Sequence, residues 1–162
     1  MKYRVLIAAI AAAVGNVFGA PPTFRVVTLR DPGVEPIPYW NAAAMNLHGE
    51  VVATYGEGYG QGHPLPYYWD RHGEPHAIPL RADPNALAVA NAINDRSEIA
   101  GYVSRGTGGV AFVYSAAKGF RRIGTDGYFA NAYGINNAGQ VVGQFNPRAW
   151  LHHPNEAVTR TR

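Results

Sequence analysis

The sequence contains no cysteine, and only 15% of its 162 residues are charged. The absence of cysteine excludes disulfides, thiolate zinc sites and a cysteine nucleophile. Serine is also scarce, and none of Ser97, Ser104 and Ser115 stands in a G-x-S-x-G motif. A serine hydrolase that relies on such a motif is therefore not expected.

The residues that are plentiful predict a folded β protein. The chain is 47% hydrophobic and has 19 glycines, 12 prolines and 10 tyrosines. The apolar fraction suffices to bury a core, while glycine and proline favour turns and tyrosine favours strands. The composition therefore indicates one domain of many short strands joined by turns.

The net charge gives no sign of a polyanionic partner. The formal charge is +3, but Lys2 and Arg4 lie in the N-terminal leader, and the remaining chain has 12 basic and 11 acidic residues. No basic cluster larger than Arg121-Arg122 follows. We therefore expect neither nucleic acid nor an anionic membrane surface as a partner.

Residues 1–20 have the pattern of a signal peptide. Lys2 and Arg4 form a positive start, and residues 5–14 are an apolar stretch that is too short to span a bilayer. Small residues then offer a cleavage site after Gly19 or Ala20. We expect residues 21–162 to be exported to the periplasm or the extracellular space, without a membrane attachment after cleavage.

A twelve-residue pattern occurs three times along the chain. Each copy holds an aliphatic residue or methionine followed by an asparagine, and ends in a short run of aliphatic and small residues. The spacings between the anchoring asparagines are 48 and 42 residues, and these asparagines are Asn46, Asn94 and Asn136. The chain is therefore predicted to be a repeat protein.

Each copy carries the chemistry of a β-hairpin turn. Asparagine hydrogen-bonds the backbone two residues on, and Gly49 and Gly139 accept positive φ, with Ser97 at the same place in the second copy. An aromatic strand follows each hairpin, and a fourth strand follows the first two. The predicted units are antiparallel, have about four strands each, and cover residues 39–80, 88–124 and 131–152 of a single domain, residues 21–162.

These motifs resemble the HAF repeat of exported bacterial proteins. Residues 136–143 match best, and Ala111-Phe112 corresponds to the Ala-Phe element of that repeat. The first copy departs from the pattern at Met45 and Leu47. Proteins of this family are similar to β-propellers with one four-stranded blade per repeat, so the resemblance implies a propeller-like arrangement here.

Three units are fewer than the four to eight blades of ordinary propellers. Three arrangements stay open: an incomplete propeller, a ring completed by self-association, and threefold closure as a β-trefoil or β-prism. The third unit lacks a fourth strand, and residues 24–29 resemble residues 120–123. The N-terminal strand is therefore a candidate for closing the third unit, with a plain edge strand as the alternative.

The most unusual segment is the glycine-rich stretch of residues 56–63, which is predicted to be a long hairpin loop. Loops on a rigid scaffold often carry function, and aromatic side chains stack on sugars and peptides. The candidate ligand-binding residues are Tyr59, His63, Tyr67 and Tyr68. Phosphate binding is not expected, because proline follows in place of a helix N-terminus or a Lys-Ser/Thr pair.

No catalytic or metal-binding set can be identified from the sequence. His72 and His76 would lie about 13 Å apart on one strand, too far to share a metal, so no cofactor is expected. No nucleophile–base pair or acid–base pair is recognisable either, and an enzyme is the least favoured class. We expect a binding or interaction module with a carbohydrate or protein ligand; the alternative is a structural fragment of a longer HAF-repeat propeller.

Overall fold

The computed structural model describes residues 6–7, 27–33, 39–56, 65–79, 86–105, 108–123, 130–145, 148–152 and 154. All regular secondary structure in these residues is β-strand, and every strand pairing is antiparallel. They include no helix of the length and apolarity needed to cross a membrane. The prediction of an all-β antiparallel protein is therefore confirmed.

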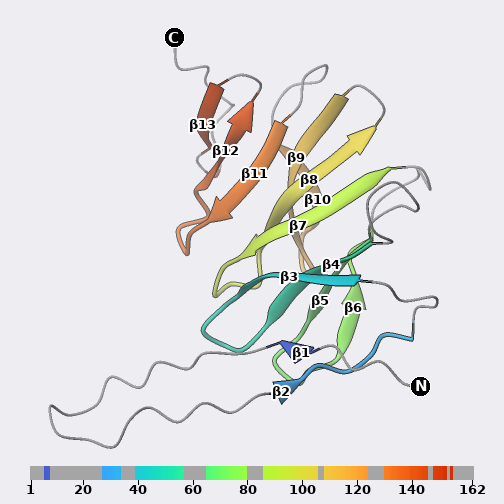
Figure 1. Ribbon diagram of the computed structural model, residues 1–162. Helices are drawn as coiled ribbons and strands as arrows, with labels where there is room; N and C mark the ends of the chain where they lie inside the picture. Colours follow the sequence, from blue (N-terminus) through green and yellow to red (C-terminus); the bar gives the residue numbers. More distant parts are fainter. Residues whose placement is uncertain are drawn as a thin grey trace, which may run out of the picture.

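Three meandering sheets follow one another along the chain (Figure 1). The first sheet consists of β3 (Tyr39–Met45), β4 (Val51–Gly56), β5 (Leu65–Trp69) and β6 (Pro75–Ala77). The second consists of β7 (Leu87–Ile93), β8 (Ile99–Arg105), β9 (Gly108–Ser115) and β10 (Gly119–Ile123). The third consists of β11 (Ala130–Ile135), β12 (Val141–Phe145) and β13 (Arg148–His152). Two of the three predicted units thus have four strands, and the third has three.

The three sheets share one local irregularity. In each first hairpin the register shifts at the same place, and these shifts lie between Ala42 and Ala44, Ala90 and Ala92, and Ala132 and Gly134. Such an extra residue bends the strand and increases its twist. The repeated sequence therefore specifies a repeated backbone distortion as well as a repeated turn.

The sheets stack face to face in chain order (Figure 1). We call the side of each sheet directed toward the following sheet its front face, and the opposite side its rear face. On the third sheet, the front face is the side directed away from the second sheet. The front face of the first sheet and the rear face of the second enclose one core, which includes Val52, Ile99 and Phe112. The second and third sheets enclose another, which includes Ala100, Val113 and Val141. Adjacent residues of one strand thus belong to different cores, as the alternation of a strand requires.

A small residue at one repeated position allows the strands to approach closely. A Cβ atom on Gly101 would lie 2.0 Å from the backbone oxygen of Val89 and 2.9 Å from the Phe112 ring. Glycine is therefore required in β8 at this place.

The rear face of the first sheet is covered by the segment that precedes it. Leu29 packs on a cluster that includes Val51 and Trp69, and the Trp69 indole donates a 2.7 Å hydrogen bond to the backbone oxygen of Arg30. Just before this segment, β2 (Val27–Thr28) pairs with β1 (Leu6–Ile7). The expected closing strand at residues 24–29 therefore lies elsewhere in its described part, beside the first sheet and not on β13.

Candidate interaction surfaces

The three hairpin turns have the same internal hydrogen bonds. The backbone N–H of each asparagine donates to the carbonyl four residues on, and the carbonyl of each asparagine accepts from the N–H three residues on. Each asparagine Oδ1 also accepts two backbone N–H groups, at 2.9–3.0 Å. The structure places the predicted turn residues Asn46, Gly49, Asn94, Asn136 and Gly139 in these turns.

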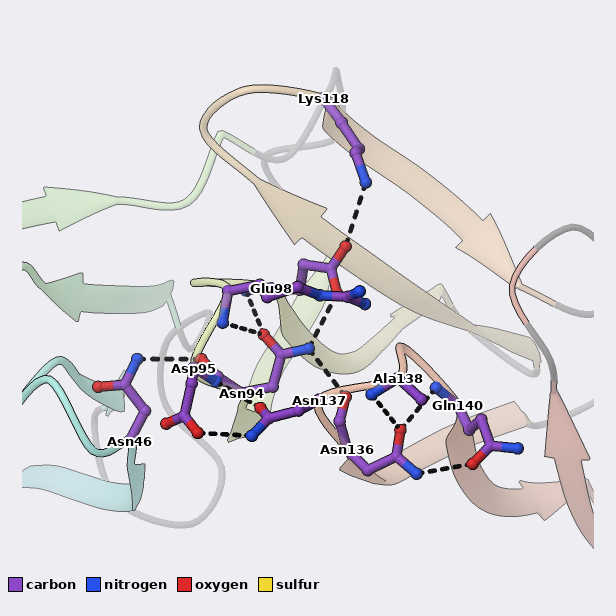
Figure 2. A network of polar contacts seen from close by, with 10 residues as sticks. Asn46, Asn94, Asp95, Glu98, Lys118, Asn136, Asn137, Ala138 and Gln140 are labelled. Atoms are coloured by element: carbon purple, nitrogen blue, oxygen red, sulfur yellow. Dashed lines mark hydrogen bonds and ion pairs between the residues drawn. The ribbon is translucent and has the colours of Figure 1, made fainter.

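The same turns are joined to one another by a second set of hydrogen bonds, which the sequence did not predict (Figure 2). Asn46 Nδ2 donates to the carbonyl of Asn94 at 2.9 Å, and Asn94 Nδ2 donates to the carbonyl of Asn136 at 2.9 Å. One residue further along, the N–H of Leu47 donates to Asp95 Oδ1 and the N–H of Asp95 donates to Asn137 Oδ1, both at 2.8 Å. We call these four hydrogen bonds between repeats the turn ladder.

The two junctions between sheets differ beside this ladder. At the first junction the Ser97 hydroxyl donates to Glu50 Oε2 at 2.7 Å, although Ser97 has φ of 56°, a conformation that favours glycine. At the second junction Gly139 takes the place of Ser97, with φ of 78°. A Cβ atom on Gly139 would lie 2.6 Å from the Arg96 guanidinium, so glycine leaves the space that this side chain occupies.

A cleft of about 530 Å³ opens between the second and third sheets. Its floor includes the apolar side chains of Val113 and Ile135. Three cationic side chains and one carboxylate line it, and these are Arg96, Lys118, Arg121 and Glu98. The cleft therefore carries a local excess of positive charge that the near-neutral composition of residues 21–162 does not reveal.

Glu98 organises the polar wall of the cleft. Its carboxylate accepts hydrogen bonds from Asn94 Nδ2 at 2.8 Å, from Arg96 at 2.7 Å and from Lys118 at 3.2 Å. Burial by itself raises the pKa of this carboxyl, but the hydrogen bonds from these three residues outweigh it and hold the pKa below its usual value. Glu98 is therefore ionised, while the Arg96 and Lys118 side chains stay 50% and 77% exposed and accessible to a ligand.

Two of the four candidate ligand-binding residues, Tyr67 and Tyr68, lie on opposite faces of the first sheet. Tyr67 lies on the rear face, edge to face with Trp40 at 5.4 Å between ring centroids. Tyr68 points to the front face, where it stacks on His76 at 4.9 Å and packs against the core shared with the second sheet. The two rings are half-buried and cannot contact one ligand together. Tyr59 and His63 lie outside the described residues.

The cleft could not be predicted from the repeat pattern, because its three cations stand at positions where the residue type differs between repeats. Arg96 corresponds to His48 and Ala138 in the other copies. Among the described residues no group of three metal-ligating side chains comes together. Comparison with family models, characterised proteins and solved structures finds no match to this chain.

Proposed function

We propose that this chain is an exported, non-enzymatic binding module that takes an anionic ligand, in the first instance an acidic oligosaccharide, in the cleft between its second and third sheets. The observation that carries the proposal is the set of three cations around one ionised carboxylate in a cleft of about 530 Å³. Carboxylate and sulfate groups bind to such exposed guanidinium and ammonium groups.

The stacked sheets support a binding role for this cleft. Arg96 projects from the β7–β8 turn, which the turn ladder holds, and Lys118 and Arg121 belong to the β9–β10 hairpin. Both hairpins are part of the second sheet, so the three cations are held in a fixed arrangement. A rigid scaffold lowers the entropy cost of ordering side chains around a ligand. The apolar floor suits the carbon face of a sugar ring.

We extend the proposal to the arrangement of the repeats and to the cellular location of the protein. The shared bulge, the turn ladder and face-to-face stacking in chain order support a propeller-like series of HAF-type repeats over trefoil or prism closure. The leader pattern in residues 1–20 supports export to the periplasm or the extracellular space.

Calorimetric titration with oligogalacturonate, and with a neutral dextran oligosaccharide of the same length, tests the proposal. We expect binding of the acidic sugar alone, weakened about three- to tenfold by Arg121→Gln. Arg71→Gln is the matched control, because Arg71 is an exposed cation in the β5–β6 turn, away from the cleft. Equal affinity for both variants, or no binding of the acidic sugar, would contradict the proposal.

A second candidate function is a structural role as one segment of a longer repeat assembly. The observation that favours it is the exposure of Val142, which is 49% accessible at a position buried in the other two repeats.

A further inference from the structure

In the part of the chain that the structure describes, no sheet covers the front face of the third sheet. Val52, Ala100 and Val142 occupy the same position in the three repeats. Val52 and Ala100 are 0% exposed because the following sheet covers them, whereas Val142 is 49% exposed. The third sheet thus exposes an apolar side chain at the place where a following sheet would pack.

The turn ladder also ends at the third sheet with unused donors. Asn136 Nδ2 donates to Gln140 Oε1 at 2.7 Å, which uses one of its two hydrogens. Asn94 and Asn46 direct their second hydrogen to the next repeat. Among the described residues neither the second hydrogen of Asn136 nor the backbone N–H of Asn137 has an acceptor. Both groups correspond to those that join the earlier repeats.

The opposite end of the series differs chemically. Leu47 holds the place of Asp95 and Asn137, and its side chain has no oxygen to accept a hydrogen bond from a preceding turn. Leu29 and the backbone of Arg30 also cover the rear face of the first sheet. Among the described residues, one end of the repeat series is therefore covered and the other is not, whereas stable repeat arrays have polar caps at both ends.

We propose that the front face of the third sheet docks a further repeat of the same type, one whose turn carries an Asn-Asp or Asn-Asn pair. The docking hairpin would offer an asparagine carbonyl to Asn136 Nδ2 and an aspartate or asparagine side-chain oxygen to the N–H of Asn137. An aliphatic residue before its asparagine would cover Val142. These are the features that the second and third repeats present to the repeats before them.

A second copy of this chain fits the same face less well. The carbonyl of Asn46 accepts only the N–H of Gly49 among the described residues and has room for one more donor. However, Leu47 offers no acceptor to Asn137, and the cover formed by Leu29 and Arg30 would have to leave the first sheet. Continuity with the two junctions inside the chain therefore favours a partner with an Asn-Asp or Asn-Asn turn.

The test appends a second copy of residues 86–123 after residue 162, so that the probe is the protein's own second sheet. We expect the thermal midpoint to rise by about 5 °C and the Asn137 amide to exchange at least about tenfold more slowly than in the unextended chain. Val142→Lys has little effect on the unextended chain, because Val142 is half-exposed, and abolishes both gains in the extended one. Asp95→Leu in the appended copy alone imitates the first repeat and removes the Asn137 protection.

Sedimentation of the unextended chain distinguishes the occupants, and we expect a monomer. A dimer that Val142→Lys dissociates would assign the face to a second copy of this chain and overturn the assignment to a repeat with an Asn-Asp or Asn-Asn turn. An extended chain without gain in stability or amide protection would overturn the docking site itself. Neither result bears on the cleft, because Val142 lies on the face opposite to Val141 and the core around the cleft.

Discussion

Replacing Asn94 by alanine would remove one hydrogen bond of the turn ladder and three hydrogen bonds within the turn of Asn94 itself. The Asn94 side chain accepts the N–H groups of Arg96 at 3.0 Å and Glu98 at 2.9 Å. It donates to Glu98 Oε2 at 2.8 Å and to the Asn136 carbonyl at 2.9 Å. The side chain that links the second sheet to the third is thus also the one that shapes its own turn.

The cost follows from the burial of these partners. A lost hydrogen bond costs about 1 kcal/mol, and more when the remaining group is buried away from water. Asn94 is 4% exposed and Glu98 is 8% exposed, so water replaces few of the lost contacts. We expect the free energy of unfolding to fall by about 3–5 kcal/mol, a large part of the total stability of an ordinary domain.

Asn136→Ala is the matched control for this prediction. Asn136 makes the same contacts within its own turn but is exposed and donates to no following repeat among the described residues. We expect it to lose only about 1 kcal/mol. Urea unfolding followed by tryptophan fluorescence measures both variants, since Trp69 is 1% exposed in the native state. Equal losses for the two asparagines would refute the stabilising role of the ladder.

Three further predictions concern backbone space, backbone strain and charge. Gly101→Ala should destabilise the protein by about 2–3 kcal/mol or more, because its Cβ would overlap a backbone oxygen, whereas Gly108→Ala, with nothing within 4 Å, should be nearly neutral. Ser97→Ala should cost about 1 kcal/mol by removing the hydrogen bond to Glu50, while Ser97→Gly loses that bond and relieves a positive φ, so its stability should stay near that of the native protein. Because the pKa of Glu98 is lowered on folding, the ionised carboxylate stabilises the fold above the unfolded pKa near 4.5, and this stabilisation is lost as pH falls through the folded pKa. Glu98→Gln should therefore flatten the decline of stability below pH 4.5.

Urea midpoints of these variants check all three predictions. Similar losses for Gly101→Ala and Gly108→Ala would show that the β8 strand shifts to make room. A Ser97→Gly variant as unstable as Ser97→Ala would mean that the positive φ stores no strain. An unchanged acid slope in Glu98→Gln would assign the acid sensitivity to other carboxylates, such as Asp70, whose pKa the His76 hydrogen bond lowers to about 2.

The three hairpins could be predicted from the sequence because their information is local. The turn asparagines and glycines bond within five residues, so a repeated pattern is sufficient to locate them. The ladder could not be predicted, since Asn94 donates to a carbonyl 42 residues away and only stacking of the sheets brings the two together. The alternation along a strand could have shown that Tyr67 and Tyr68 point to opposite faces. The location of β2 depends on tertiary packing of Leu29, which no local pattern specifies.

The difference between the two junctions has a consequence for how the chain assembles. A protein of similar repeats risks joining units in the wrong order while it folds. Here the carboxylate of the first repeat accepts a hydrogen bond from a hydroxyl of its neighbour, and that of the second binds an arginine for which the neighbour's glycine leaves room. Joining the first repeat directly to the third would leave Glu50 without the Ser97 hydroxyl, since Gly139 has none. The two junctions therefore differ in their side-chain contacts, and a repeat that joins out of order loses a contact that its own neighbour supplies.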